Sequence, residues 1–400
     1  MFIFNKLKSL IKIIKGSPLG LFIIIQFIIS NKKTNIVKLF SSKFGHFLVN
    51  TEIFLREKYS SKENFIFFTE ETIDNELLLN LWNKKIKIIS YDVGFFLQKC
   101  SFFTNWKYYD LRDFTFPRNK KKYRDKNYLF PKKQINFDRG KYFTCSIRTS
   151  NYNKYTQLFN KKELDSFQSW RDTDINNFLL AMSRATSKKM QAIIINKLFK
   201  NKLKKKKHKN LIFHKNYDLE KIFNYVINSK FHLASSTGID SISYLNNIPT
   251  AYVNGTLGLG FHSISFSDLS IFCPLNIYSV SEKKILSLKE HIKLLKDLQK
   301  KFNIDRLELE HQKYYGVRYE KQSSDEIYNV ILEIKKLSQN KNFLKKKDIT
   351  LQKKFWKIYP DKWYFNYTNA CIFNKRLNKT IISPYFLRKY ERIYFNNSIF

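Results

Sequence analysis

Residues 231–254, FHLASSTGIDSISYLNNIPTAYVN, constrain the fold more than any other stretch of this chain. The apolar run 231–234 has the length of a buried strand, and four small or flexible residues follow it at 235–238. Apolar residues then recur at helical spacing from Ile239, until Pro249 ends the helix before a β-rich run. The turn between such a strand and helix exposes N–H groups that suit a phosphate. It is equally compatible with an ordinary serine N-cap, so the stretch alone leaves both interpretations open.

Strand and helix patterns alternate along the rest of the chain in two blocks, 31–140 and 141–345. A Lys-, Arg- and Pro-rich connection over 110–141 separates them. The alternation predicts an α/β protein with two facing Rossmann-like domains, followed by an aromatic-rich helical tail over 346–400 that packs back on them. Strands are predicted at 35–40, 65–68, 86–90, 142–147, 192–195 and 210–214, and helices at 73–81, 174–184, 219–227, 281–296 and 324–338. Ligands of such folds bind beyond the carboxyl ends of the strands, where the turns 41–46 and 235–238 are expected.

Residues 1–30 combine a basic amphipathic helix with the apolar run 19–29, which is too short to span a bilayer. No small-residue cleavage site follows, which argues against a secretory signal. We predict that this segment rests on the anionic inner face of the plasma membrane, which makes the protein cytoplasmic and peripheral. The alternative is a helix packed on its own domain. The four widely spaced cysteines, without a CxxC pair, fit a reducing compartment.

The formal net charge of +40 predicts a surface that attracts anions such as nucleotide diphosphates, acidic lipids or nucleic acid. Abundant Lys, Asn, Ile, Phe and Tyr also indicate an AT-rich genome, so part of this charge reflects mutational bias. The lysine-rich run 200–210 is predicted to be a solvated loop. No Walker loop, GxGxxG, HExxH or GxSxG is present, so kinase, dehydrogenase, metalloprotease and hydrolase assignments lack support. No nucleic-acid-binding motif is visible either.

Six stretches, taken in chain order, resemble a family of bacterial glycosyltransferases. These proteins are GT-B-like and are associated with the synthesis of surface polysaccharides, and the resemblance covers roughly residues 35–400. The stretches are FGHFLVNTEIFLRE (44–57), FTCSIRTSNY (143–152), SWRDTDINNFL (169–179), FHLASSTGIDSISYLNNIPTAYVN (231–254), GVRYEKQSSDEIYNVILEI (316–334) and ISPYFL (382–387).

The resemblance implies roles for particular residues. Gly45 and His46 match a turn on the acceptor side of the cleft. A serine-rich turn that holds the donor diphosphate is matched by Ser235, Ser236, Thr237 and Gly238. Arg148, on the strand that opens the second domain, faces the cleft and is expected to bind the donor diphosphate together with this turn. The remaining matches, Tyr152, Arg171 and Asp172, are expected to line the cleft. The chain departs from the family pattern after 174–184, where AIIINKLFK replaces an Arg-Met-Gly-like strand end and Lys197 is the nearby cation.

Glycosyl transfer requires stabilisation of a leaving diphosphate and, for inversion, a base for the acceptor hydroxyl. His46 is a candidate base because an ordinary histidine titrates near neutral pH; its alternative role is packing or capping. Glu52 could orient His46 or, with Asn50, bind the acceptor, and Asp240 could bind a sugar or ribose hydroxyl. A carboxylate at the position of Asp240 is equally favourable in the first turn of a helix.

The DxD pattern at 172–174 precedes a predicted helix, so we interpret it as an N-cap instead of a metal site. No metal or cofactor is expected.

These features predict a glycosyltransferase that moves a sugar from a nucleotide-diphosphate donor to a polysaccharide or lipid-linked glycan in surface polysaccharide or lipopolysaccharide synthesis. Two alternatives remain. One is a nucleotide-sugar epimerase or polysaccharide pyruvyltransferase on the same architecture. The other is a non-catalytic basic protein that binds nucleic acid or acidic lipid. The sequence does not distinguish inversion from retention.

Overall fold

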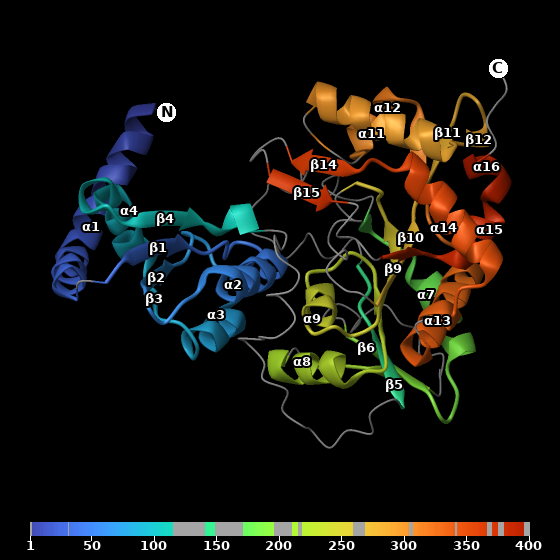
Figure 1. Cartoon of the computed structure of the whole chain (residues 1–400), viewed down its shortest axis with the longest axis horizontal. Helices are drawn as coiled ribbons and strands as arrows, with labels where there is room; N and C mark the ends of the chain where they lie inside the picture. The colour runs from blue at the N-terminus through green and yellow to red at the C-terminus, as the bar shows by residue number, and fades with distance from the viewer. Residues whose placement is uncertain are drawn as a thin grey trace. The chain divides into compact units, whose positions relative to one another are not determined.

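The computed structural model describes residues 2–30, 32–114, 141–148, 171–195, 210–214, 218–258, 269–302, 304, 307–340, 342–365, 370–374 and 380–395. The chain divides into two compact units, Met1–Lys133 and Gln134–Phe400 (Figure 1).

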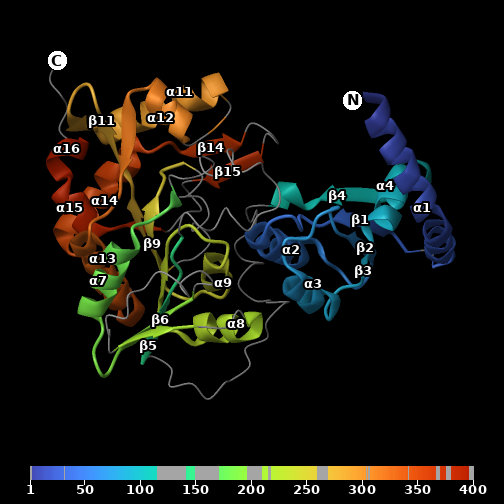
Figure 2. The ribbon, with the colours of Figure 1, turned by 180° about the vertical axis from the view of Figure 1, so that it is seen from behind.

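The first unit is built on a four-stranded parallel sheet with the order β3-β2-β1-β4. Helices α2 and α3 lie on one face of this sheet, and α4 and α1 lie on the other (Figures 1 and 2). Fully buried apolar side chains such as Val37, Phe68 and Leu97 form its core. Its elements are α1 (Phe2–Ile29), β1 (Thr34–Lys38), α2 (Phe44–Lys58), β2 (Asn64–Phe68), α3 (Glu76–Asn83), β3 (Ile88–Ile89), α4 (Tyr91–Thr104), β4 (Lys107–Asp110) and the 3-10 helix η1 (Leu111–Phe114).

A seven-stranded sheet forms the second unit, and every neighbouring pair of its strands is parallel. Its order, β7-β6-β5-β8-β9-β10-β16, is the doubly wound Rossmann order with one further strand at the edge. The direction of winding reverses between β5 and β8. These strands are β5 (Tyr142–Cys145), β6 (Gln191–Ile194), β7 (Leu211–Phe213), β8 (His232–Ala234), β9 (Thr250–Gly255), β10 (Ser270–Pro274) and β16 (Ile381–Ile382).

Helices cover both faces of this second sheet, with α8 and α9 on one face and α7 and α13 on the other (Figures 1 and 2). A three-stranded antiparallel sheet of β12, β11 and β13 adjoins it in the chain. The elements are α7 (Ile175–Ala185), α8 (Leu219–Asn228), α9 (Asp240–Leu245), β11 (Asn276–Ser279), β12 (Lys284–Ile285), α11 (Leu288–Phe302), α12 (Leu309–Tyr314), β13 (Val317–Glu320), α13 (Ser324–Gln339), α14 (Lys346–Ile358), β14 (Lys362–Phe365), β15 (Ala370–Asn374), α15 (Pro384–Lys389) and α16 (Glu391–Phe395).

The alternating α/β pattern and the helix over 324–338 are confirmed, the latter as α13. The helix predicted over 281–296 is wrong at its start, because β12 occupies Lys284–Ile285 and α11 begins only at Leu288. The cause is local: Glu290 accepts from the Ser287 N–H at 2.7 Å, and the Ser287 hydroxyl accepts from the Glu290 N–H at 3.3 Å. This reciprocal pair marks a helix start.

The segment 346–400, predicted as a tail, contributes to the sheet of the second unit. Ile381 and Ile382 of β16 pair in parallel with Ile271 and Phe272 of β10. The segment therefore belongs to the domain itself. Of the lysine-rich run predicted to be a solvated loop, 200–209 lies outside the described residues.

Candidate functional site

The candidate site lies at the carboxyl edge of the second sheet, where β5 and β8 run side by side. Arg148 follows β5, and the turn 235–238 follows β8. The Ser235 hydroxyl joins the two strand ends, because it accepts from the Arg148 N–H at 2.8 Å and donates to the Ser146 carbonyl at 2.9 Å. In doubly wound folds, ligands bind at the edge where the direction of winding reverses between two neighbouring parallel strands.

Arg171 holds the serine-rich turn in an uncommon conformation. Ser236 has a φ of 69°, in the left-handed region that serine seldom adopts. The Arg171 Nε donates to the Ser236 hydroxyl at 2.9 Å, and its Nη2 donates to the Ser236 carbonyl. The guanidinium thereby fixes both the side chain and the backbone of this residue.

Arg148 places a second guanidinium at the same edge. Its side chain is 3% exposed, and its Nε lies 3.6 Å from the Asp172 carboxylate. Burial raises the pKa of Asp172, although Arg148 and Lys321 act to lower it. The Thr173 N–H and hydroxyl both donate to the Arg148 carbonyl, at 3.0 and 2.8 Å. The segment 171–173 and the end of β5 are therefore tied together at the switch point.

Asp240, predicted to contact the donor, points into the protein instead. It is 1% exposed and accepts from the Thr237 N–H at 2.7 Å and the Thr237 hydroxyl at 2.8 Å. Ser146 donates to it as well, and His232 Nε2 lies 3.2 Å from it. These contacts correct two expectations, since the carboxylate is used internally and the Thr237 N–H is not open to a phosphate. The helix that follows, α9, spans only Asp240–Leu245.

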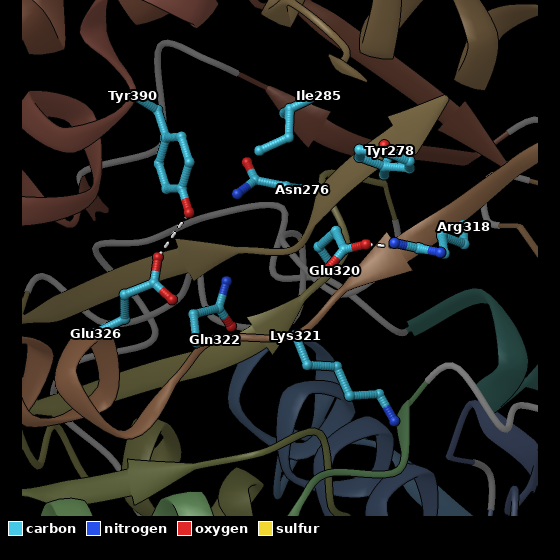
Figure 3. Close-up of a pocket in the computed structure, with 9 residues that line it drawn as sticks. All are labelled: Asn276, Tyr278, Ile285, Arg318, Glu320, Lys321, Gln322, Glu326 and Tyr390. Atoms are coloured by element: carbon cyan, nitrogen blue, oxygen red, sulfur yellow. Dashed lines mark hydrogen bonds and ion pairs between the residues drawn. The ribbon is translucent and has the colours of Figure 1, made fainter. Parts of the chain in front are cut away.

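A polar pocket of about 370 Å³ is lined by residues of the antiparallel sheet β11, β12 and β13, by the segment that leads into α13, and by Tyr390 (Figure 3). Gln322 forms part of the pocket wall and is held by Asn254 and Pro274. The Asn254 N–H donates to Gln322 Oε1, and the Gln322 N–H donates to Asn254 Oδ1, both at 2.9 Å. Gln322 Nε2 donates to the Pro274 carbonyl. Figure 3 shows Lys321 pointing away from the hydrogen-bonded pair Tyr390 and Glu326. Desolvation lowers the pKa of Lys321, although Asp172 and Asp174 beside the switch point act to raise it. Tyr278, Arg318 and Asn276 supply further polar groups.

No family model and no curated protein matches this sequence. Among solved structures, the ADP-heptose lipopolysaccharide heptosyltransferase II of E. coli is 9% identical, with 60% of this chain and 89% of that chain covered at a TM-score of 0.39. The E. coli heptosyltransferase WaaC with ADP is 10% identical, with 60% and 93% covered at a TM-score of 0.34. A UDP-N-acetylglucosamine 2-epimerase is 9% identical, with 78% and 98% covered at a TM-score of 0.36. Similarity at this level carries no argument about activity, and the Rossmann assignment rests on the strand order.

In the first unit, the predicted residues Gly45, His46, Asn50 and Glu52 all lie on α2. The turn predicted over 41–46 is therefore wrong at its end, because α2 begins at Phe44 and places Gly45 and His46 in its first turn. The His46 ring stacks on Phe40 at 4.6 Å between centroids. Asn50 is buried and donates to the Leu111 carbonyl at 2.7 Å, which fastens α2 to η1. Glu52 is buried and accepts from Arg56 Nε at 2.8 Å. Residues six apart on a helix do not share a face, so this geometry does not favour the predicted orientation of His46 by Glu52.

In the turn after β1, as in the turn of the second unit, carboxylates of the protein accept from backbone N–H groups, which sequence patterns did not indicate. Glu70 accepts from the Ser42 N–H at 3.0 Å and from Arg112 at 2.6 Å, and Asp74 accepts from the Phe44 N–H at 2.8 Å. Burial opposes the charge on Glu70, yet hydrogen bonds from Ser42 and Arg112 leave its pKa below the ordinary value. Carboxylates of the protein thus occupy N–H groups that an anion would need.

Asp174 caps α7 by accepting from the Asn176 N–H at 2.8 Å, which confirms the N-cap interpretation of the DxD pattern. Tyr152 and Lys197 lie outside the described residues. Sequence reasoning missed Asn254, although an Asn-Gly dipeptide is a recognised turn signal. Asn254 and Gly255 form the end of β9, and Asn254 has a φ of 59°.

Proposed function

We propose that this protein is a GT-B-like glycosyltransferase that moves a sugar from a nucleotide-diphosphate donor to a polysaccharide or lipid-linked glycan acceptor. The observation that carries the proposal is the Rossmann switch point of the second unit, where Arg148, Arg171 and the serine-rich turn meet. Two cationic side chains at this edge suit a diphosphate, whose negative charge grows as the bond to the sugar breaks.

In this proposal Arg171 is the residue that meets the donor. It is partly buried, and its guanidinium already lies on Ser236 at the edge of the turn. Arg148 is more deeply buried and acts through its field, because a buried positive charge is weakly screened by water. The two roles differ, since Arg171 is expected to form hydrogen bonds to phosphate oxygens and Arg148 to raise the local potential.

The pocket beside Gln322 is the proposed place for the uncharged parts of the donor. Its lining offers amide, phenol and carboxylate groups, which suit sugar or ribose hydroxyls. On the first unit, His46 is the proposed base for the acceptor hydroxyl, since an imidazole can accept a proton near neutral pH.

A thermal-shift screen of UDP-, GDP-, ADP-, CMP- and dTDP-sugars tests the donor site. A donor at about 100 times its dissociation constant should stabilise the protein by about 2.7 kcal/mol. We expect Arg171→Lys to raise the dissociation constant of the donor at least tenfold, because lysine keeps the charge but loses the planar pair of donors. At the same donor concentration the stabilisation should fall to about 1.4 kcal/mol or less. The matched control is Arg184→Lys, which changes an exposed arginine of the same unit that pairs with Asp325.

If no nucleotide sugar stabilises the wild type, the proposal is wrong. If one does, product analysis with and without acceptor decides the reaction. Conversion of the sugar without any acceptor would identify an epimerase on this architecture, and would overturn the transferase assignment.

A further inference from the structure

Helix α1 of the first unit has two different faces, and one of them is closely fitted to α4. A Cβ atom added at Gly16 would lie 2.2 Å from the Asp92 carbonyl oxygen, and one added at Gly20 would lie 2.2 Å from the Phe96 ring. Small residues four apart let two helices approach this closely. Ile23 is buried in the same hydrophobic cluster as Phe96 of α4, so α1 is packed on its own domain along this side.

The opposite face of α1 is apolar and exposed. At about 100° per residue, its side chains fall within about one third of the helix circumference. Their exposed fractions run from 53 to 77%: Ile14, Leu21, Phe22, Ile25, Ile28 and Ile29. Exposed side chains of this size seldom gather in one stripe unless something covers them.

The backbone of α1 is suited to an environment without water. Pro18 has no N–H, so the Ile14 carbonyl loses its usual helical donor. The Ser17 hydroxyl donates to that carbonyl at 2.9 Å. At the end of the helix, the Ser30 hydroxyl donates to the Phe27 carbonyl at 2.8 Å. Serine hydroxyls satisfy backbone carbonyls in this way within membranes, where no water can do so.

Charge and length decide how such a helix would meet a bilayer. The span Ser9–Ile29 is long and apolar enough to cross a membrane, with a mean hydropathy of 1.7. Its uncharged part, 16–29, is however only about 21 Å long, short of the roughly 30 Å hydrocarbon core. Lys12 is held to the domain by Glu71 at 2.6 Å and lies over the Tyr91 ring. The helix is therefore pinned sideways to an α/β domain and cannot be surrounded by lipid.

We propose that α1 binds an anionic lipid bilayer in the plane of its surface, with the face around Phe22 and Ile25 buried among the acyl chains. The contact between Gly16 and α4 then fixes the first unit to the membrane. Exposed Lys15, Lys32 and Lys33 flank the apolar face and suit anionic headgroups. This inference is independent of the proposed sugar transfer, since it uses no residue of the donor site.

Co-sedimentation of the full chain with phosphatidylcholine vesicles, with and without phosphatidylglycerol, tests the binding. We expect tighter binding to the anionic vesicles and at least a tenfold loss in Phe22→Glu/Ile25→Glu. Leu77→Glu/Leu180→Glu is the matched control, because it adds the same charge at apolar side chains of similar exposure, 47 and 51%. Equal binding by wild type and Phe22→Glu/Ile25→Glu, or no binding by the wild type, would overturn the proposal.

Two measurements separate the remaining possibilities. An epitope at the N-terminus should stay open to protease added outside vesicles carrying the wild type, whereas protection would show a spanning helix and overturn the in-plane mode. Sedimentation velocity without lipid tests the other occupant of this face. A dimer that Phe22→Glu/Ile25→Glu converts to a monomer, without vesicle binding, would show an interface between two copies and contradict the proposal.

Discussion

At the scale of single residues, the contact between Arg171 and Ser236 determines the shape of the candidate site. Ser236 is buried and left-handed, with a φ of 69°. That conformation costs about 1–2 kcal/mol for a residue with a Cβ, and the Arg171 hydrogen bonds offset the cost. The conformation of the turn is thus fixed by a hydrogen-bond partner that lies 65 residues away in sequence.

This balance predicts an order of stability between two substitutions. Both Ser236→Ala and Ser236→Gly lose the hydrogen bond from Arg171 Nε, worth about 1 kcal/mol. Only glycine also relieves the left-handed strain, so we expect Ser236→Gly to be the more stable of the two by about 1 kcal/mol. Urea unfolding measures the difference, and a more stable Ser236→Ala would show that the turn is unstrained.

His291 of α11 predicts a pH dependence. It is fully buried, its ring nitrogens have no hydrogen-bond partner within the described part of the chain, and burial lowers its pKa to about 3. The unfolded chain, with a histidine pKa of about 6.5, therefore binds more protons than the folded chain between these values. Stability is fully present above about pH 6.5 and falls as the pH is lowered through this window.

We expect His291→Leu to remove this contribution to the pH dependence of stability. Below pH 6.5, the free energy of unfolding should fall less steeply than in the wild type, by up to about 1.4 kcal/mol per pH unit. Burial raises the pKa of Glu333 to about 7, which acts in the opposite direction, so the two proteins must be compared at each pH. Parallel curves from pH 7.5 to 5 would contradict the prediction.

At the scale of elements, the packing of α1 on α4 reverses the usual effect of replacing a helical glycine by alanine. In an exposed helix, replacing glycine by alanine stabilises by up to about 1 kcal/mol. At Gly16 the new methyl group would meet the backbone of Asp92, which cannot move aside as a side chain can.

We therefore expect Gly16→Ala to destabilise the first unit by about 1–3 kcal/mol, the usual cost of overpacking. Limited proteolysis should cut α1 faster in this variant than in the wild type. Gln26→Ala, at an exposed position of the same helix, is the control and should leave the rate unchanged. A stabilised Gly16→Ala would mean that α1 does not pack on α4 in solution.

At the scale of the whole molecule, the chain divides into two compact units, and each has its own parallel sheet and core. Separate cores allow separate unfolding, which calorimetry detects as two transitions. We expect Leu97→Ala, a fully buried position of the first unit, to lower one transition, and a bound nucleotide sugar to raise the other. A ligand that raises the transition sensitive to Leu97→Ala would place the donor on the first unit.

The sequence by itself determined the features that depend on neighbours along the chain. Alternating apolar runs predicted the two α/β blocks, the turns after β1 and β8 were found at the carboxyl ends of strands, and Asp174 was recognised as an N-cap. These are local properties, since periodicity, turn residues and caps act within a few residues.

Only the tertiary structure decided which side chains meet. It turned Asp240 inward onto Ser146 and His232, brought Arg171 to Ser236, and made β16 an edge strand beside β10. The partners of these groups are distant in sequence, so no local pattern contains them. A carboxylate at the start of a helix is favourable whether it faces a ligand or the core, and only packing decides between the two.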